Sequence, residues 1–391
     1  MSPEVSIILT VYNMESCLRQ TMASVVGQTF TDLEIICIDD GSTDASLSIL
    51  QEYAAVDERI RIVSRENKGQ GASRNEGLEL AQGEYVMLLD ADDIYDTTMV
   101  GKLAARAMQS DADVVVCRAV ELDDASGRQR SILWTARADW MPAHDPFSGL
   151  EMADCLLLGF IGWPWDKLYK RSFIEENALR FPPLANSEDL YFVFLSLVLA
   201  QRISFVDEEL IEHRVGRSGS VSNSRTAEPC AFYEGICMLK ERLQQSDELW
   251  PAFKWGFLNW ALDYTLWNIE YMADGAARAQ MIGCLANGEF AELELDRHAK
   301  AYFNLRPDVY ERYEALMDQA SKAASAGTLA DASEKHPAMR LPAAFFSEAK
   351  DNGWHAAIDK TTAKLKGQDA SERAGNKVER GQVYFPQESQ L

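Results

Sequence analysis

A series of apolar runs, each about as long as a β-strand, constrains the fold of this chain more than any other feature. They lie at Val5–Val11, Leu33–Asp39, Ile60–Ser64, the start of 85–93, and 113–118. Strands buried on both faces have such continuous apolar sequences. Between them we expect four helices. They lie at about 15–26, from the turn at 43–44 to about 56, at 69–81 and at 98–109. Strands that alternate with helices form right-handed crossovers, so the sequence predicts an α/β fold with a mainly parallel sheet.

Two helix starts carry candidate caps. Asn13 precedes the helix expected at 15–26, and Thr43 or Asp44 precedes the next one. Short polar side chains at these positions can accept hydrogen bonds from the first free backbone N–H groups of a helix.

The stretch 85–93 ends in three carboxylates, Asp90, Asp92 and Asp93. Open α/β sheets bind ligands at the carboxyl ends of their strands. Closely spaced carboxylates repel one another unless a cation joins them. Oxygen ligands suit Mg²⁺ or Mn²⁺, which complete their shell with water and substrate phosphates. We therefore expect a metal site here; the alternative is a solvated acidic turn that caps the next helix.

Polar residues also follow the other strands of the expected sheet. Thr10 and Tyr12 follow the first strand, Asp39 and Asp40 end the second, and Arg74 follows the third. A Thr hydroxyl and an Asp carboxylate can hydrogen-bond a nucleobase, and a Tyr ring can stack on it. A guanidinium can bind carboxylates or phosphate. Each residue alone has an ordinary structural explanation, but one shared rim predicts a site for a nucleoside diphosphate.

The segment 69–74, Gly-Gln-Gly-Ala-Ser-Arg, approaches the dinucleotide fingerprint Gly-x-Gly-x-x-Gly. Arg74 replaces the third glycine, which allows close helix–strand packing in that motif, and the turn follows the third strand. A nicotinamide or flavin site is therefore not expected.

Composition excludes other classes of function. A net charge of -23 over 391 residues argues against a nucleic-acid partner and against docking on an anionic membrane. The seven cysteines are scattered without a Cys-x-x-Cys pair, which indicates reduced thiols and no zinc site. We find neither a signal peptide nor an apolar run long enough to span a bilayer. We therefore expect a cytoplasmic protein, possible action at the inner face of the membrane being left open.

Four motifs carry a resemblance to a known family: 3–13 (Pro-Glu-Val-Ser-Ile-Ile-Leu-Thr-Val-Tyr-Asn), 38–44 (Ile-Asp-Asp-Gly-Ser-Thr-Asp), 67–75 (Asn-Lys-Gly-Gln-Gly-Ala-Ser-Arg-Asn) and 89–93 (Leu-Asp-Ala-Asp-Asp). Together they resemble the family 2 glycosyltransferases, which have the GT-A fold, a Rossmann-like sheet flanked by helices. A second cluster at 165–171, 181–182 and 187–192 resembles the acceptor half of bacterial members that build surface polysaccharides. The resemblance covers about residues 1–222.

The resemblance implies a nucleotide-diphosphate sugar donor, commonly a UDP-sugar, and a bound Mn²⁺ or Mg²⁺. Thr10, Tyr12 and Arg74 would contact the nucleotide, and either Asp39 or Asp40 would read the base. On the metal side, Asp90 would face the ribose and the metal, and Asp92 would ligate the metal.

On the acceptor side, Asp189 matches the family's catalytic base, with its neighbour Glu188 as second choice. Trp165 and Tyr169 are candidates to line a sugar platform, and Asp93 to contact the acceptor or the diphosphate. The segment 213–220 (His-Arg-Val-Gly-Arg-Ser-Gly-Ser) is expected to be a loop; alternatively, Arg214, Arg217 and Ser220 close over the diphosphate.

The implied reaction is an inverting transfer of the sugar to a hydroxyl of a saccharide or lipid-linked acceptor. One alternative is a Mg²⁺-dependent phosphohydrolase of the haloacid-dehalogenase type. That class also has Asp-x-Asp after a strand, but it wants Thr or Val where this chain has Ile94. Another alternative is an inactive scaffold that only binds a nucleotide-sugar.

For domain organisation, we expect a catalytic domain at 1–222, divided into a nucleotide-sugar half (1–118) and an acceptor half (119–222). A helical region at 223–324 follows, with helices near 233–243, 250–272 and 302–324 from the spacing of apolar residues. The remainder, 325–391, is expected to hold short helices and a loosely ordered end. Pairing of subunits through the helical region is left open.

Overall fold

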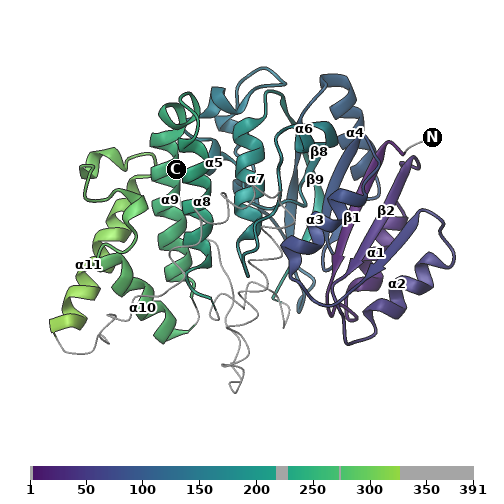
Figure 1. The fold of residues 1–391 in the computed structure, drawn as a ribbon, viewed down its shortest axis with the longest axis horizontal. Helices are drawn as coiled ribbons and strands as arrows, with labels where there is room; N and C mark the ends of the chain where they lie inside the picture. Colours follow the sequence, from purple (N-terminus) through teal and green to yellow (C-terminus); the bar gives the residue numbers. More distant parts are fainter. Residues whose placement is uncertain (1–2, 217–227, 273, 326–391) are drawn as a thin grey trace. The chain divides into compact units, whose positions relative to one another are not determined.

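The computed structural model describes residues 3–216, 228–272 and 274–325 (Figure 1). The chain divides into two compact units. Unit 1 comprises Met1–Pro183 and Glu188–Arg217, and unit 2 comprises Leu184–Ser187 and Ser218–Leu391. Two residues considered for the diphosphate, Arg217 and Ser220, lie outside the described residues, as does all but the first residue of the expected tail at 325–391.

The described strands of unit 1 form one nine-stranded sheet in the order β3-β2-β1-β4-β8-β6-β9-β5, with β7 paired to β6. The strands are β1 (Val5–Val11), β2 (Leu33–Asp39), β3 (Ile60–Ser64), β4 (Tyr85–Asp90), β5 (Ile94–Tyr95), β6 (Val114–Asp123), β7 (Gln129–Ser131), β8 (Lys167–Lys170) and β9 (Ile203–Val215). β1, β2, β3 and β4 pair in parallel, as do β6 and β9.

Strand β8 lies antiparallel between β4 and β6, so these two neighbours still run in the same direction. All five strands expected from the sequence therefore point the same way, and their carboxyl ends share one edge. The predicted α/β fold with a mainly parallel sheet is confirmed. The sequence analysis did not identify β5, β7, β8 and β9 as strands, and the expected loop at 213–220 begins with the last three residues of β9.

Helices cover both faces of this sheet. They include α1 (Leu18–Val26), α2 (Ser46–Ala54), α3 (Gln70–Leu80) and α4 (Met99–Ser110). Alternate strand residues such as Ile7 and Leu9 share one core with α1, α2 and α4. Helix α3 lies on the opposite face, where a Cβ on Gly77 would be 2.3 Å from Cγ2 of Ile8, so only glycine fits. Thr10 follows Ile8 by two residues and therefore faces the same side as Ile8.

The predicted cap at Asn13 is wrong. Helix α1 begins at Leu18, and Asn13 adopts a left-handed φ of 53° and accepts a hydrogen bond from the backbone N of Thr43 at 2.8 Å. Asparagine tolerates this conformation better than most residues. The side chain thus joins the turns after β1 and β2. At α2, Oδ1 of Asp44 does accept from the backbone N of Ser46, the first helical residue, at 2.9 Å.

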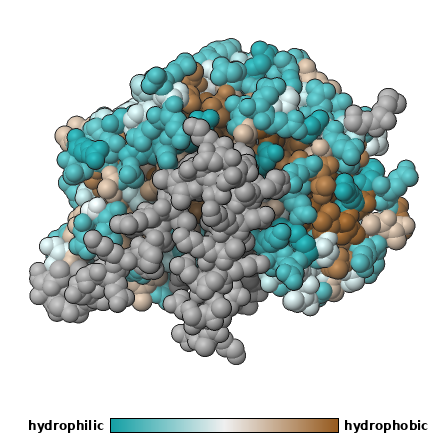
Figure 2. All heavy atoms as spheres, in the orientation of Figure 1, coloured by the Kyte–Doolittle hydropathy of each residue, from teal (hydrophilic) through white to brown (hydrophobic). Residues whose placement is uncertain are grey.

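The rest of unit 1 consists of short helices between the later strands. They are η1 (Leu133–Thr135), η2 (Ala138–Trp140), η3 (Gly149–Met152), α5 (Leu156–Gly159), α6 (Arg171–Glu176) and α7 (Glu188–Leu199). Nearly every residue of α7 is buried. On the face shown in Figure 2, the surface outside the uncertain residues is mostly hydrophilic, and polar side chains interrupt its hydrophobic patches.

The described part of unit 2 is helical. Its elements are α8 (Ala231–Gln244), α9 (Leu249–Glu270), α10 (Gly275–Ala286), η5 (Ala291–Leu293), η6 (Lys300–Tyr302) and α11 (Pro307–Ser325). Helix α9 packs against α8, α10 and α11, and its aromatic residues are largely buried. The helix expected at 302–324 is present as α11, which begins later than expected, at Pro307. Among the described helices, none has the length and apolar character needed to cross a membrane.

Candidate active site

One face of α3 holds the segment that leads into α7. Gly71, Arg74 and Asn75 are spaced i, i+3 and i+4, so they share that face. Asn75 donates to the carbonyl of Phe181 at 2.8 Å and accepts from its backbone N at 2.9 Å. A Cβ on Gly71 would lie 3.0 Å from Cγ of Glu188. The second glycine of 69–74 therefore permits close approach of another chain segment, and this explains the partial dinucleotide motif.

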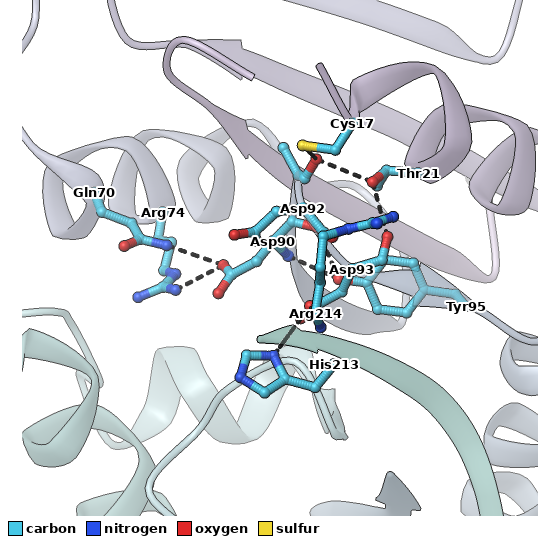
Figure 3. A network of polar contacts seen from close by, with 11 residues as sticks. Cys17, Thr21, Gln70, Arg74, Asp90, Asp92, Asp93, Tyr95, His213 and Arg214 are labelled. Carbon is cyan, nitrogen blue, oxygen red and sulfur yellow. Dashed lines mark hydrogen bonds and ion pairs between the residues drawn. The ribbon is translucent and has the colours of Figure 1, made fainter. Parts of the chain in front are cut away.

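Arg74 joins the end of β4 to the start of α7. Figure 3 shows its contact with Asp90 at the end of β4. Its Nη2 lies 2.8 Å from Oδ1 of Asp90, and its Nη1 lies 2.8 Å from Oε1 of Glu188. Gln70 donates to the same Asp90 oxygen at 2.9 Å. The Arg74 side chain is only 2% exposed, and its guanidinium lies over the ring of Phe181. A single buried cation thus holds the acidic strand end and the predicted base segment in one place.

Glu188 and Asp189 occupy the first turn of α7 but differ in surroundings. Glu188 is buried and ion-paired with Arg74, whereas Asp189 is partly exposed. Burial and the neighbouring Asp189 raise the pKa of Glu188 to about 7, while the charge of Arg74 acts in the opposite direction. Of the two candidates for the base, Asp189 is the one that a ligand can reach.

The acidic turn after β4 is fixed from several sides. Thr21 of α1 donates to the carbonyls of Ala91 and Asp93. The Asp93 carboxylate is fully buried; it accepts from the backbone N of Arg214 at 2.9 Å and lies 3.0 Å from Nδ1 of His213. Asp93 thus anchors the end of β9 and is not placed to contact a ligand, unlike the contact suggested by the sequence.

His213 and Arg214 also contact this turn (Figure 3). Burial alone would lower the pKa of His213, but the charges of Asp93, Asp92 and Asp90 raise it to about 9. Arg214 is buried, and its Nε donates to the carbonyl of Asp92 at 2.9 Å. The acidic turn is therefore balanced by cations supplied from the end of β9.

At the end of β1, the two predicted nucleotide contacts differ in how far their side chains are exposed. Thr10 pairs in register with Asp90, and its buried Oγ1 has no hydrogen-bond partner among the described residues. The Tyr12 side chain is 46% exposed. The Tyr12 ring is therefore open to a ligand at the carboxyl end of the sheet, whereas the Thr10 hydroxyl is buried at the same strand end.

The carboxylates of Asp39 and Asp40 are both buried. Asp40 accepts from the backbone N atoms of Lys68 and Gly69 at 2.9 and 2.8 Å. Arg65 lies 2.9 Å from the same carboxylate. Asp39 accepts from the hydroxyl of Ser64 at 2.7 Å and more weakly from the backbone N of Ser42 at 3.2 Å. Asp40 is therefore the more fully committed to holding its own turn.

Trp165 and Tyr169 do not lie at an open surface. Trp165 is 2% exposed and Tyr169 is fully buried in β8, where its ring packs against Phe192. Tyr169 is buried because β8 is an interior strand, which the sequence analysis did not foresee, and Trp165, just before β8, packs into the core of the sheet. A sugar platform made by these two rings is not supported by the structure.

Asp90 and Asp92 fit a cation that shares its shell with phosphate. Within the described part of the chain, no group of three or more His, Cys, Asp or Glu side chains is arranged to hold a metal by itself. Arg74 and Gln70 both bind Oδ1 of Asp90, and Oδ2 of this carboxylate accepts no hydrogen bond from the described residues. Mg²⁺ and similar ions commonly bind one or two carboxylates together with substrate phosphates, so the donor set suits such a site.

Sequence reasoning missed the residues that position this site. Gln70, Asn75 and His213 were given no role, and Glu188 was considered only as a base. For Gln70 and Asn75, the available signal was the spacing of Gly71, Arg74 and Asn75, which places these three residues on one face of a helix. His213 gave none, because its contact with Asp93 joins residues 120 positions apart.

The sheet order and the acidic turn after β4 define a GT-A type protein, and solved structures agree. Staphylococcus aureus TarS 1-349 in complex with UDP-GlcNAc superposes with a TM-score of 0.64, at 21% identity, over 85% of this chain and 95% of that chain. A mannosyltransferase from Pyrobaculum calidifontis, in complex with GDP-Man and Mn²⁺, gives a TM-score of 0.50 at 17% identity, over 85% of this chain and 88% of that one. At these identities the likeness shows the fold alone.

Sequence comparison then gives the family. A model described as glycosyl transferase family 2 matches residues 6–176. The putative glycosyltransferase EpsH of Bacillus subtilis is 34% identical over 63% of this chain and 71% of its own length. A cholesterol galactosyltransferase of Borreliella burgdorferi is 34% identical over 56% of this chain and 62% of its own. The chain belongs to the family 2 glycosyltransferases.

Proposed function

We propose that this protein is an inverting, metal-dependent glycosyltransferase. It moves a sugar from a UDP-sugar to a hydroxyl of a saccharide or lipid-linked acceptor during cell-surface polysaccharide synthesis. The observation that carries the proposal is the Arg74 bridge, 2.8 Å from both Asp90 and Glu188. Through it the acidic end of β4 and the carboxylate pair at the start of α7 border one site. The UDP-GlcNAc complex of the structurally similar TarS supports the choice of nucleotide.

For the nucleotide, we assign base recognition to Asp39 and Thr10. Asp40 is committed to two backbone N–H groups and Arg65, whereas Asp39 accepts one strong and one long hydrogen bond. The unpartnered hydroxyl of Thr10 gains a partner when a base binds. The exposed ring of Tyr12 then offers a surface for stacking.

Asp92 and Asp90 would hold Mn²⁺ or Mg²⁺, which when bound supplies Lewis-acid stabilisation of the leaving diphosphate. Arg74, expected from the sequence to contact the nucleotide, is 2% exposed and ion-paired on both terminal nitrogens. In our proposal it acts by orienting Asp90 and by neutralising Glu188.

Asp189 would remove the proton from the acceptor hydroxyl as that oxygen attacks the anomeric carbon. A hydroxyl is a weak nucleophile, so a base in hydrogen-bond reach is required. Attack opposite the leaving diphosphate inverts the anomeric centre in one displacement. Glu188, held by Arg74, would fix the start of α7 so that Asp189 points to the acceptor.

A thermal-shift panel tests the donor half of the proposal. Nucleotides and nucleotide-sugars carrying uridine, guanosine, cytidine or thymidine are compared with and without Mn²⁺. We expect UDP and UDP-sugars with metal to stabilise the protein by roughly 3 kcal/mol at a hundredfold excess over the dissociation constant, and to stabilise it much less at the same concentration without metal. Asp92→Asn should abolish the metal-dependent part, and Asp154→Asn, at an exposed position, should not. Absence of stabilisation by every nucleotide would refute the proposal.

Asp189→Asn separates an enzyme from an inactive scaffold. The substitution should lower the rate of transfer about 10²- to 10⁴-fold while donor binding persists. Binding of the donor without transfer by the wild-type chain to any offered acceptor would favour the scaffold. Membership of family 2 argues against the phosphohydrolase; cleavage of a simple phosphate ester without a sugar acceptor would revive it.

A further inference from the structure

Two loops of unit 1 bring two tryptophans together beside the acidic turn. Trp134 belongs to η1, Trp163 precedes β8, and their ring centroids are 5.8 Å apart at an angle of 65°. Both side chains are partly exposed. Neither residue was singled out from the sequence as a ligand contact. We call this pair of indoles the aromatic wall.

The backbone ties the two loops of the aromatic wall to each other. The N of Ile161 donates to the carbonyl of Thr135 at 2.9 Å, and the N of Arg137 donates to the carbonyl of Gly159 at 2.8 Å. Between these bonds, residues 136 and 160 form an antiparallel bridge. The two indoles are therefore carried by one small ladder, and their relative position does not depend on side-chain contacts alone.

A buried lysine holds the Trp163 loop. The ammonium group of Lys167 is fully buried and donates to the carbonyls of Ile161 and Trp163, at 3.1 and 2.8 Å, and to Oδ1 of Asp166 at 2.5 Å. An ammonium has three N–H donors, so all of them are used. Lys167 thus fixes the backbone from which Trp163 projects, and its charge is unavailable to a ligand.

A buried arginine holds the Trp134 loop in the same way. Arg118 of β6 donates to the carbonyls of Leu133 and Ala136, at 3.3 and 2.9 Å, and forms an ion pair with Asp207. Its side chain is 10% exposed. Both tryptophans therefore sit on loops whose carbonyls are bound by buried cations, an arrangement that pre-organises an aromatic surface.

The imidazole of His213 connects the aromatic wall to the acidic turn. Trp163 stacks on Trp165 with a centroid distance of 4.8 Å, and the imidazole of His213 lies 4.8 Å from the ring of Trp163. His213 in turn contacts the Asp93 carboxylate. Any ring bound against the aromatic wall is therefore close to the carboxylates proposed to hold the donor.

We propose that Trp134 and Trp163 form the subsite for a neutral sugar ring of the acceptor. The electron-rich face of an indole attracts the C–H face of a pyranose, and a rigid indole loses little conformational entropy on binding. Lys167 and Arg118, behind the aromatic wall, bind backbone carbonyls and carboxylates, so among the described residues these two cations are not offered to a ligand and the indoles favour stacking on a neutral ring. This inference rests on the proposed function and names the substrate class that the acceptor side takes.

Saturation-transfer NMR tests the aromatic wall directly, with the protein loaded with UDP and diamagnetic Mg²⁺. The probes are methyl β-glucopyranoside, methyl β-galactopyranoside and methyl N-acetyl-β-glucosaminide. For at least one of them we expect transfer to the ring C–H protons. Trp163→Ala and Trp134→Ala should reduce this signal at least about fivefold. Trp163→Phe, which keeps a ring, should retain most of it.

Trp250→Ala, in α9 of unit 2, is the matched control and should leave the saccharide signal unchanged. Each variant is also checked for stabilisation by UDP and Mn²⁺, which shows that unit 1 is folded. The inference is overturned if no pyranoside receives saturation or if both alanine variants match the wild type. It is also overturned if octanol, an apolar ligand without a sugar ring, receives saturation and no pyranoside does. If the wild-type protein bound a saccharide but no nucleotide, the proposed function would be refuted, and the assignment of the aromatic wall as a sugar subsite would stand.

Discussion

Arg74 is buried between two carboxylates, and its removal leaves at least one charge without a partner. The Glu188 side chain is 7% exposed, whereas that of Asp90 is 21% exposed and better able to recruit water. Removing one partner of a buried pair typically costs about 3–5 kcal/mol, because the other charge stays buried. We expect Arg74→Met to lower the free energy of unfolding by this order, as measured by urea denaturation.

A double-mutant cycle checks the cause of this loss. Glu188→Gln in the Arg74→Met background should restore part of the stability, since a neutral amide tolerates the site better than an unpaired carboxylate. Arg19→Met is the control, because Arg19 pairs with Glu52 on the surface and its loss should have no measurable effect. Additive effects of the two buried substitutions would contradict the coupling.

The polar residues at the strand ends could be found from the sequence, and the packed aromatics could not. Thr10 and Asp90 stand at the ends of apolar runs, so the direction of the strands alone placed them on one rim. Tyr169 belongs to a strand of four residues that includes two lysines, and Trp165 lies just before it; this pattern is too short and too polar to indicate a buried strand. The motif that contains these two residues could be recognised in the sequence, but their burial could not be predicted from it.

Helix α3 shows how one glycine fixes the distance between two elements. A Cβ on Gly71 would lie 3.0 Å from Cγ of Glu188, 3.1 Å from the carbonyl of Pro182 and 3.3 Å from Cβ of Phe181. Gly71→Ala should therefore push the 181–188 segment from α3, destabilise the protein by about 1–3 kcal/mol and lower the rate of transfer. Denaturation and single-turnover transfer measure the two effects.

Gly101→Ala in α4 is the matched control for that substitution. A Cβ at Gly101 meets only Cβ of Phe30, at 3.7 Å, which is ordinary contact. Alanine favours the helix over glycine by up to about 1 kcal/mol. The control should therefore be neutral or stabilising. If both alanine variants gained stability, the close approach at Gly71 would not be the constraint that we infer.

The strands illustrate the same limits of sequence reasoning. The bounds of β1, β2 and β3 were predicted correctly, because largely apolar, β-branched runs ended at charged or turn residues. Strand β9 was missed because it carries Asp207, Glu208 and Glu209 in its middle, where a register shift interrupts its pairing with β6. Long-range pairing with β6 stabilises this strand, and no local pattern reports such pairing.

In unit 2, η5 and the helices around it meet at one buried carboxylate. Oxygens of Glu294 lie 2.9 Å from the Nζ atoms of Lys240 in α8 and Lys254 in α9, and 3.0 Å from Nε2 of His298. Burial alone would raise the pKa of Glu294, but these hydrogen bonds lower it to about 2. The ionised form is therefore favoured in the folded state.

Because the folded pKa lies below the ordinary value of 4.5, the stabilisation is complete above that pH and is lost as the pH falls towards 2. Glu294→Gln should lower the free energy of unfolding by about 3 kcal/mol at pH 7. The difference from wild type should shrink between about pH 5 and pH 3. Urea titrations at several pH values measure it. Glu311→Gln, at an exposed position, should track the wild type throughout; a constant gap for Glu294→Gln would exclude the linkage.

The whole chain carries a net charge of -23, and its proposed donor is also an anion. The described cations that contact the acidic turn, Arg74, His213 and Arg214, are paired with the protein's own carboxylates. A nucleotide approaching without metal therefore meets net repulsion, which salt screens over a shorter distance as ionic strength rises. A cation bound at Asp90 and Asp92 would remove most of that repulsion locally.

This balance predicts an unusual dependence of UDP binding on salt. Raising NaCl from 20 to 300 mM shortens the screening length from about 20 Å to about 6 Å. Without metal, the affinity for UDP should then rise about two- to tenfold. With saturating Mn²⁺ the change should be below about twofold, and uridine, which lacks phosphate, should show none in either case. Isothermal titration measures UDP and uridine, with and without Mn²⁺, at both salt concentrations. A fall in metal-free affinity with salt would mean that unpaired cations, and not the overall negative charge, dominate the field at the acidic turn.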